Sequence, residues 1–345
     1  MNQVTEVVPQ LAEEVPLQVL FGATSAMGAI RSSLEKIVDT NIPVLIEGES
    51  GTGKEVIARY IHQRSLWSQG PFVKVNCPAI PGTLVESELF GYERGAFTGA
   101  FGYKPGRVEM ADRGTLFLDE ISELAVSLQS KLLQLLQDGQ FCPIGGREEK
   151  KVDIRVICAT NRQLEREVGA GRFRQDLYYR ITGVVLQLPP LRERTEDLGL
   201  LVSHFIALHG ERYRRTAPPL SASTMGLMRA HQWPGNIREL ENLIKRYVVL
   251  GSEDVITREL RSRNVEQFNP EIPVGDSLPL KKVTRDAIRD LESKIILNTL
   301  QANHWNRKRA ARALKISYRA LLYKLKRTGL DMPRERRAEL PAEEV

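Results

Sequence analysis

The chain has 345 residues, 42% of them hydrophobic and 27% charged, and a formal net charge of +6. This composition is typical of a globular protein and excludes a largely disordered chain, and the length suits two or three domains. The sequence has no apolar run near the roughly 20 residues of a membrane span and no apolar signal core in residues 1–14, so we expect a cytoplasmic protein without membrane insertion. Because it has no CxxC pair, we expect neither a disulfide framework nor a zinc site.

Strands and helices alternate from residue 43 to about residue 190. Short segments rich in β-branched residues predict strands, and the stretches between them, such as 124–136, carry apolar residues at helical spacing. This alternation predicts an α/β fold in which helices cover a parallel sheet. The predicted strands are residues 43–47, 72–76, 115–118, 154–159 and 184–188.

A glycine-rich segment follows the first predicted strand and opens a helix, which is the context of a P-loop. Its glycines let backbone N–H groups converge on phosphate oxygens, the helix N-terminus adds its positive end, and Lys54 reaches the outer phosphates. A plain glycine turn is the alternative. Position 55 is a glutamate where such a motif usually has the Ser or Thr that contacts Mg²⁺, which leaves a direct metal role for this residue open. The segment is Gly48-Glu49-Ser50-Gly51-Thr52-Gly53-Lys54-Glu55.

Residues 95–100 predict a mobile loop, because a glycine begins it and another lies near its end. Phe97 and Thr98 at the tip would offer an apolar anchor and a hydroxyl to another protein. The residues alone leave a second interpretation open, a flexible loop with a stray aromatic. The six residues are Gly95-Ala96-Phe97-Thr98-Gly99-Ala100.

The apolar strand predicted at 115–118 ends in two carboxylates, as a Walker B segment does. Burial of the strand would hold Asp119 at its C-terminal tip, where it can organise a magnesium ion, and Glu120 beside it can polarise the attacking water. A strand that ends in Asp-Glu is weak evidence alone, but the P-loop upstream strengthens it. Together the two segments predict an ATPase that uses ATP and Mg²⁺.

Helices without intervening strands are predicted at 198–208, 221–230 and 237–250, which indicates a small helical lid. The next segment, residues 261–280, is polar and contains three prolines. It cannot bury enough apolar surface to fold alone, so we interpret it as a linker.

The basic charge is concentrated near the C-terminus. Residues 281–330 contain fourteen Lys and Arg against three Asp and Glu, a net +11, which leaves −5 of the total +6 for the rest of the chain. Such a patch suits the phosphate backbone of a nucleic acid, although a solvated helix face is the alternative for charge without a motif.

The same region predicts a helix-turn-helix. Residues 307–314 form a short helix with Ala310 and Ala311 on one face, and Ser317 can cap a second helix that runs through residue 326. Small alanines let the two helices cross closely, although a helical pair that only dimerises would look similar. Residues at the start of the second helix would face base edges, and the remaining basic residues would face phosphates. The expected DNA-binding residues are Tyr318, Arg319 and Lys324 in the first role, and Arg307, Lys308, Arg309 and Lys326 in the second. Ser317, the cap, is also expected at the DNA-binding surface.

The hexapeptide at 95–100 matches, without a change, the most specific signature of the activators of sigma-54 RNA polymerase. The chain resembles this NtrC-like branch of the AAA+ ATPases from about Phe21 to Leu330. The resemblance implies an AAA+ parallel sheet with a helical lid, followed by a Fis-type helix-turn-helix domain. It also implies that the hexapeptide loop extends from a ring on nucleotide binding and engages sigma-54.

Other positions match motifs of this family. Arg174 and Arg180 look like the arginine fingers that reach the nucleotide bound to the neighbouring subunit, although surface arginines in salt bridges are the commoner case. Asn161 resembles sensor I and Arg238 resembles sensor II. Asn76 matches the residue that restrains the catalytic glutamate of the family.

A second surface loop, near Ile144-Gly145-Gly146, is similar to that of the family but less well matched. Pro143 and Ile144 stand where the family often has Arg-Val. The contact role of this loop is therefore less certain than that of the hexapeptide.

The resulting organisation is a short N-terminal tail at 1–19, an α/β ATPase subdomain at 20–192, a helical lid at 193–260, a linker at 261–282, a helix-turn-helix domain at 283–330 and a charged tail at 331–345. Members of the family commonly begin with a receiver or ligand-sensing domain, for which the first residues are too few. We therefore expect control in trans, by a regulatory protein or by the amount of activator.

The expected function is ATP-dependent activation of the sigma-54 RNA polymerase holoenzyme. Dimers would bind double-stranded enhancer DNA, assemble into a hexameric ring and hydrolyse ATP to remodel the closed promoter complex through the loop at 95–100. Two alternatives are a DNA-bound regulator with a vestigial ATPase site, and a different AAA+ machine such as a helicase or a protease-unfolding subunit. The complete set of nucleotide-site residues argues against the first, and the intact hexapeptide argues against the second.

Overall fold

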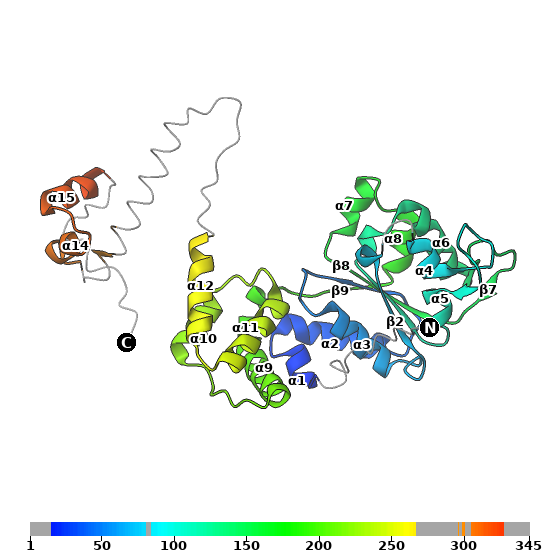
Figure 1. Ribbon diagram of the computed structural model, residues 1–345, viewed down its shortest axis with the longest axis horizontal. Helices are drawn as coiled ribbons and strands as arrows, with labels where there is room; N and C mark the ends of the chain where they lie inside the picture. Colours follow the sequence, from blue (N-terminus) through cyan, green and yellow to red (C-terminus); the bar gives the residue numbers. More distant parts are fainter. Residues whose placement is uncertain (1–14, 81–83, 267–295, 297–298, 301–304, 328–345) are drawn as a thin grey trace, which may run out of the picture. The chain divides into compact units, whose positions relative to one another are not determined.

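The computed structural model describes residues 15–80, 84–266, 296, 299–300 and 305–327, in two compact units that divide after Asn264 (Figure 1). The predicted tails at 1–14 and 331–345, and the predicted linker from residue 267 onward, lie outside these residues. The larger unit contains an α/β part and a helical part. The described part of the smaller unit is helical.

The α/β part is built on five parallel strands in the order β2-β5-β8-β1-β9. Because all five run the same way, their carboxyl ends meet at one edge of the sheet, where ligands bind in open α/β folds. The five predicted strands are all present, and the parallel α/β fold is confirmed. The strands are β1 (Val44–Glu47), β2 (Phe72–Asn76), β5 (Thr115–Asp119), β8 (Arg155–Thr160) and β9 (Val184–Gln187).

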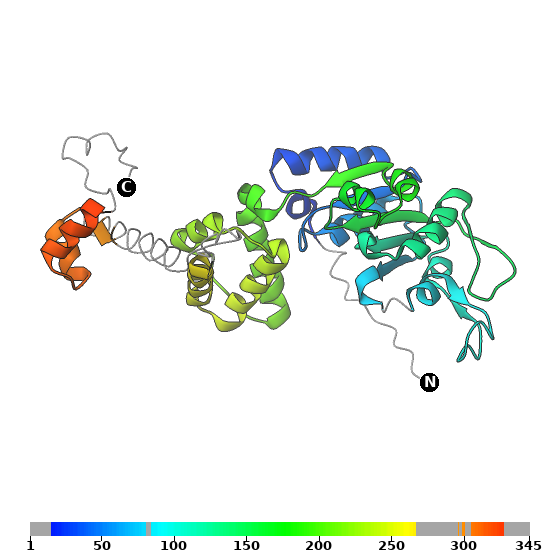
Figure 2. The ribbon, with the colours of Figure 1, turned by 90° about the horizontal axis from the view of Figure 1, so that it is seen from above.

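Alternate residues of each central strand are buried on opposite faces of the sheet, as its pleat requires. On one face Val44 and Ile46 pack with residues of α2 and α3, and on the other Leu45 and Leu116 pack with residues of α6 and α8. In Figure 2, α2 runs along one face of the sheet. The helices of this part are α1 (Leu17–Phe21), α2 (Ser25–Ile37), α3 (Lys54–Arg64), α4 (Val85–Phe90), α5 (Arg107–Met110), α6 (Val126–Asp138), α7 (Leu164–Gly169) and α8 (Gln175–Ile181).

Two short hairpins carry the surface loops. The strands β3 (Gly91–Tyr92) and β4 (Lys104–Pro105) form one, and β6 (Gln140–Phe141) and β7 (Lys150–Lys151) form the other. The hexapeptide loop lies between the strands of the first hairpin, and the second surface loop lies between those of the second.

The helical part is the predicted lid, with its own apolar core around the buried Trp233, whose indole N–H donates to the carbonyl of Met228 over 2.8 Å. The structure corrects the predicted limits at one end: α12 continues through Glu266, so residues 261–266 are helical and not linker. The lid helices are α9 (Leu198–Tyr213), α10 (Ala222–Ala230), α11 (Asn236–Leu250) and α12 (Asp254–Glu266).

The structure also corrects the predicted N-terminal tail. Residues 17–21 form the helix α1, in which Phe21 belongs to the core on one face of the sheet and Val19 to the core of the lid. This short helix therefore packs against both the sheet and the lid.

In the smaller unit, α14 (Arg307–Ala313) and α15 (Tyr318–Arg327) form the predicted helix-turn-helix. The side chain of Ser317 accepts a hydrogen bond from the N–H of Ala320 over 3.1 Å, which is the expected cap. Ala310 and Ala311 are buried against Leu321 and neighbouring apolar residues, so the small side chains permit the close crossing.

Candidate functional site

The P-loop leaves β1 and ends at the start of α3. Gly51 and Gly53 have φ angles of +80° and +98°, which favour glycine and turn successive backbone N–H groups inward. Lys54 is 7% exposed and its ammonium donates to the carbonyl of Gly48 over 2.8 Å. Backbone, helix N-terminus and lysine therefore converge as phosphate binding requires.

The carboxylate that follows Asp119 occupies a backbone conformation that is rare for glutamate. Glu120 has φ 55° and ψ 54°, in the left-handed region, and backbone of this kind is common at functional sites. Its Oε1 lies 3.4 Å from Nζ of Lys54, and its Oε2 accepts a hydrogen bond from the N–H of Asn161 over 2.8 Å. The predicted catalytic glutamate, P-loop lysine and sensor I residue thus lie together.

Asn76 ends β2 and lies beside Asp119 in the strand register, next to this group. Its side chain is exposed, and no hydrogen bond joins it to Glu120 in the described part of the chain. The restraint expected of Asn76 stays a prediction.

A network of charges surrounds position 55. The carboxylate of Glu55 accepts from Nζ of Lys74 over 2.6 Å and from Nη2 of Arg59 over 2.9 Å, and the same Nζ lies 3.5 Å from Oδ2 of Asp119. Burial alone would raise the pKa of Glu55, but the hydrogen bonds from the two cations outweigh it and lower the pKa. The Glu55 carboxylate is therefore ionised, and it forms ion pairs with Lys74 and Arg59.

The donor set fits a magnesium ion that arrives with a nucleotide. No group of three or more His, Cys, Asp or Glu that could hold a metal by itself occurs among the residues that the structure describes. Magnesium in nucleotide sites uses one or two protein carboxylates and takes its other ligands from phosphates and water. Asp119, half-buried at the tip of β5, supplies a carboxylate of that kind.

The start of α11 closes over the P-loop. The carbonyl of Gly51 accepts from the N–H groups of Ile237 and Arg238 over 2.9 and 3.3 Å, and the Arg238 guanidinium donates to Oγ of Ser50 over 3.0 Å. The predicted sensor II arginine therefore lies at the phosphate-binding loop.

A second contact joins the P-loop to the segment between sheet and lid. The guanidinium of Arg192 donates to both carboxylate oxygens of Glu49, over 2.9 and 2.6 Å, and the amide of Asn236 donates to the same carboxylate over 3.1 Å. These hydrogen bonds lower the pKa of Glu49. Sequence reasoning missed Arg192 and Asn236, because only the fold brings them to the loop.

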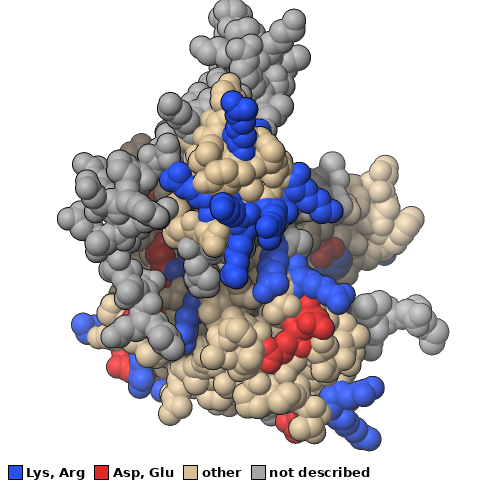
Figure 3. All heavy atoms as spheres, turned by 90° about the vertical axis from the view of Figure 1, so that its left-hand side faces the viewer, with Lys and Arg blue, Asp and Glu red and all other residues tan. Residues whose placement is uncertain are grey.

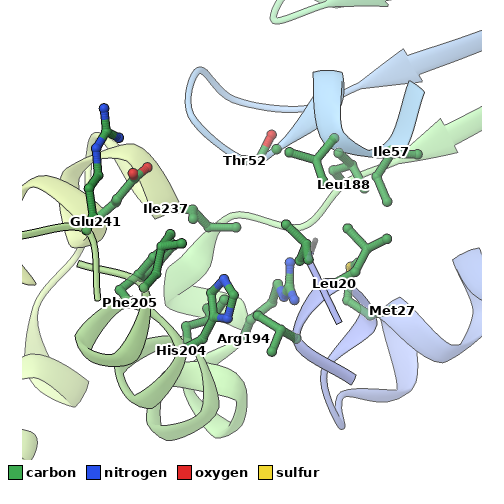
Figure 4. A pocket seen from close by; sticks show the side chains of 17 residues that line it. Leu20, Met27, Thr52, Ile57, Leu188, Arg194, His204, Phe205, Ile237 and Glu241 are labelled. Atoms are coloured by element: carbon green, nitrogen blue, oxygen red, sulfur yellow. The ribbon is translucent and has the colours of Figure 1, made fainter. Parts of the chain in front are cut away.

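An apolar cavity of about 510 Å³ adjoins the P-loop. Figure 4 shows Thr52 at its edge, with Leu20 of α1, Met27 of α2, and His204 and Phe205 of α9 around it. Burial lowers the pKa of His204, so the imidazole there is neutral near pH 7. A mostly apolar cavity with a few polar groups suits the flat base of a nucleotide.

Arg194 adds a hydrogen-bond donor to this cavity. Its guanidinium is 2% exposed and donates through Nε to Oδ2 of Asp197 over 2.9 Å, whereas Nη2 has no hydrogen-bond partner in the described part of the chain. Sequence reasoning missed this cavity, because α1 was interpreted as a tail and the other lining residues are far apart in the sequence.

The two candidate arginine fingers lie away from this nucleotide site. Arg174 donates to both oxygens of Asp176 over 3.0 and 2.7 Å, which lowers the pKa of Asp176 to about 2, and Arg180 donates to the carbonyl of Leu136. Both arginines therefore contact the α6 and α8 region, and neither contacts the P-loop of its own chain in the described structure. Buried Gln129, which the sequence did not single out, accepts from the N–H of Arg174 and fixes its backbone.

The hexapeptide forms a closed loop. The N–H of Gly95 donates to the carbonyl of Ala100 over 2.8 Å, and both glycines of the loop have positive φ, +82° for Gly95 and +110° for Gly99. The ring of Phe97 packs edge-on against Tyr92 at 4.9 Å, and Thr98 is exposed. The tip thus presents its hydroxyl to solvent while the aromatic rests on its own chain.

The second surface loop supports the first. The N–H of Ile144 donates to the carbonyl of Gly91, and the carbonyl of Ile144 accepts from the N–H of Glu93 over 2.9 Å. The two loops are therefore joined at their bases, although Pro143-Ile144 departs from the pattern expected there.

The helix-turn-helix exposes basic side chains. Figure 3 shows Lys and Arg gathered on the face of this unit. Lys308, Arg309 and Arg319 are exposed, Tyr318 is 44% exposed at the start of α15, and Arg307 and Lys324 are half-buried. Lys326 belongs to α15, but its side chain lies outside the described part of the structure.

The described residues include no helix long and apolar enough to cross a membrane.

Three family models match successive parts of the chain. One described as "Sigma-54 interaction domain" matches residues 20–187, one described as "AAA+ ATPase lid domain" matches 192–272, and one described as "Bacterial regulatory protein, Fis family" matches 287–327.

Similar proteins span most of the chain. Regulatory protein AtoC of Escherichia coli (strain K12) is 46% identical over 309 residues, which cover 89% of this chain and 67% of that protein. DNA-binding transcriptional regulator NtrC of Rhizobium meliloti (strain 1021) is 38% identical over 346 residues, 92% and 71% of the two chains. The crystal structure of NtrX from Brucella abortus in complex with ATP is 33% identical, with a TM-score of 0.64 over 89% of this chain and 68% of that one.

Proposed function

The chain belongs to the family of sigma-54-dependent transcriptional activators, with an AAA+ ATPase domain and a Fis-type helix-turn-helix, and we propose that it hydrolyses ATP to remodel sigma-54 RNA polymerase at promoters. The observation that carries this proposal is the convergence of Lys54, Glu120 and Asn161 beside the P-loop, in a chain that also carries the intact hexapeptide.

ATP would bind with its phosphates on the P-loop and its base in the cavity between α1, α2 and α9. NtrX, which is similar over most of this chain, has been solved in complex with ATP, which supports ATP as the nucleotide. The free Nη2 of Arg194 would donate to a ring nitrogen of the base. Asp119 would hold a magnesium ion together with phosphate oxygens, and the ion would supply charge neutralisation at the γ-phosphate.

Hydrolysis would need a second subunit. Glu120 would orient and polarise the attacking water, while charge on the γ-phosphoryl group would be stabilised by Arg174 and Arg180 of a neighbouring subunit. Support comes from the position of these arginines on the exposed α6 and α8 region, out of contact with their own P-loop. We propose a ring, of hexamer size by family likeness.

The loop at 95–100 would contact sigma-54 and act on it when ATP is hydrolysed. A single hydrogen bond from Gly95 to Ala100 closes the loop, its glycines give the backbone conformational freedom, and exposed Thr98 can contact a partner directly. The helix-turn-helix would hold the assembly on double-stranded enhancer DNA. Base edges would be contacted by Tyr318, Arg319 and Lys324, and phosphates by Arg307, Lys308, Arg309 and Lys326.

Promoter opening by the purified protein tests this function. With sigma-54 holoenzyme and an enhancer-bearing template, open complexes should form with ATP and not with a non-hydrolysable analogue. Absence of ATP turnover at high protein concentration would favour a DNA-bound regulator with a vestigial site. Turnover without binding to sigma-54 in the presence of a transition-state analogue would favour a different AAA+ machine.

A further inference from the structure

We infer that Lys74 keeps the Asp119 carboxylate neutralised until a nucleotide brings its metal, and so makes metal binding depend on nucleotide binding. The inference rests on the proposed function, because it gives a role to a further side chain of the same site. Lys74 would be a positioning residue: it acts on the metal through Asp119.

The register of the sheet places Lys74 in this position. In β2, Lys74 pairs with Phe117 and Asn76 pairs with Asp119 of β5, so the lysine lies one pleat before the tip of the strand. Its Nζ is 2.6 Å from Oε2 of Glu55 and 3.5 Å from Oδ2 of Asp119. The ammonium is therefore fixed between two carboxylates and is only about one-third exposed, at 32%.

Glu55 acts as the anchor of this lysine. Its other oxygen accepts from Nε and Nη2 of Arg59 over 3.1 and 2.9 Å, and the Arg59 guanidinium in turn lies over the ring of Phe72. A carboxylate held this way cannot turn to a metal without giving up both cations. The network accounts for a glutamate at a position where a hydroxyl usually contacts magnesium: here the side chain orients Lys74.

The charges of the site make the metal and the nucleotide interdependent. Each of the two carboxylates at the end of β5 faces one lysine, Glu120 with Lys54 and Asp119 with Lys74. A bare divalent cation on Asp119 would be repelled by the ammonium beside it. A magnesium ion already bound to the phosphates of ATP carries net negative charge with it, which both lysines attract. The metal therefore enters with the nucleotide.

Binding of Mn²⁺ tests the inference without any measurement of activity. Free Mn²⁺ is counted by electron paramagnetic resonance in titrations of the full chain, alone and with a non-hydrolysable ATP analogue. The wild-type protein should bind the ion tightly only with the analogue. Lys74→Met should bind Mn²⁺ alone about tenfold more tightly, the order of effect expected for loss of a neighbouring like charge, and Lys74→Arg should resemble the wild type.

Two further variants sharpen the experiment. Glu55→Gln removes one negative charge from the site and leaves Lys74 to pair with Asp119 alone, so its nucleotide-free binding of Mn²⁺ should be no tighter than that of the wild type. Lys36→Met makes the same change at an exposed lysine of α2 and should alter nothing. Binding of the analogue in EDTA shows that each variant has a folded site.

The outcomes separate the inference from the proposed function. If Lys74→Met binds Mn²⁺ alone no more tightly than the wild type, while the wild type binds it with the analogue, the role of Lys74 is overturned and the ATPase proposal stands. If the wild type binds no Mn²⁺ even with the analogue, the metal site of the proposed function fails and the inference fails with it.

Discussion

Gly145 lies against Ala96, so that the second surface loop forms a support for the hexapeptide loop. A Cβ built on Gly145 would lie 2.7 Å from Cβ of Ala96, and its φ of +74° is one that favours glycine. Gly145→Ala should therefore displace the hexapeptide and reduce binding to sigma-54, with ATP hydrolysis retained. Gly171→Ala is the matched control, because Gly171 also has a positive φ, +69°, but open space around it. Equal loss of binding in both variants would show that the contact with Ala96 is not what matters.

Thr98→Ala should separate hydrolysis from transcription. The hydroxyl is exposed at the tip of the loop and outside the nucleotide site, so its removal leaves the P-loop and Glu120 unchanged. We expect ATP turnover within about twofold of the wild type and loss of open complexes, because an exposed side chain at a contact can carry much of the binding energy. Phosphate release and promoter opening, both measured on the same preparation, test whether the variant loses one activity and keeps the other. A matching loss of both would make the loop a structural element of the ATPase.

Arg174→Ala should lower ATP turnover by about 10³-fold or more, the range known for an arginine finger. The loss should be partly restored when the variant is mixed with Lys54→Ala subunits, because one subunit would then offer an intact nucleotide site and the other an intact arginine. A turnover assay across mixing ratios measures this. If mixing restores nothing, Arg174 acts within its own chain, or serves only its salt bridge with Asp176.

Leu20→Trp should weaken nucleotide binding by filling the cavity beside Thr52. The larger side chain competes with a base for the same apolar space, so the KM for ATP should rise about tenfold or more, the factor equivalent to roughly 1.4 kcal/mol of binding. Leu66→Trp makes the same change at a side chain that is 72% exposed and should leave the KM unchanged. An unchanged KM in Leu20→Trp would place the base elsewhere.

The free energy of unfolding should fall as the pH drops from 7 to 5. Burial lowers the pKa of His209, and the nearby cations of Lys245 and Arg212 add to this effect, whereas the Glu241 carboxylate 3.6 Å from its Nε2 does not outweigh them. The unfolded chain then takes up a proton near the ordinary histidine pKa of about 6.5, before the folded chain does, so stability is lost as the pH falls through that value.

His209→Phe keeps an aromatic ring beside Phe205 and Tyr213 and removes this titration. Because one histidine contributes at most about 1.4 kcal/mol per pH unit, the variant should show a shallower decline over the same range. Denaturant titrations followed by the fluorescence of buried Trp233 measure it. An equal decline in variant and wild type would assign the pH dependence to other groups, such as His62, whose pKa is also lowered by burial.

The sequence predicted those parts of the molecule that depend on local pattern. The central strand β5 contains the continuous apolar run 116–118, the P-loop is defined by its glycines and lysine, and the helix-turn-helix is defined by alanines at helical spacing. Each of these signals lies within one short segment. The fold class and the nucleotide-site segments could therefore be predicted before the structure was seen.

The rest depends on which strands are neighbours. The ion pair of Lys74 with Asp119 forms because β2 and β5 are neighbours, and the contact of Arg192 with Glu49 joins residues far apart in the sequence. The helix α1 is too short to show a clear apolar period, so the predicted tail at 1–19 included Val15 and Val19, which line the apolar cavity. For α12, a polar composition concealed a helix whose buried residues, Ile256 and Leu260, belong to the lid core.

The carbonyl of Gly51 carries a mechanical consequence. The Gly51 carbonyl oxygen accepts hydrogen bonds from the N–H groups of Ile237 and Arg238. A Cβ on Gly51 would come within 2.4 Å of the Gly235 carbonyl, so the lid and the P-loop are tightly packed at their junction. The lid cannot tilt relative to the sheet without pulling on the backbone that surrounds the nucleotide. Under the proposed function, loss of a phosphate from the P-loop would therefore change the angle of the lid as well.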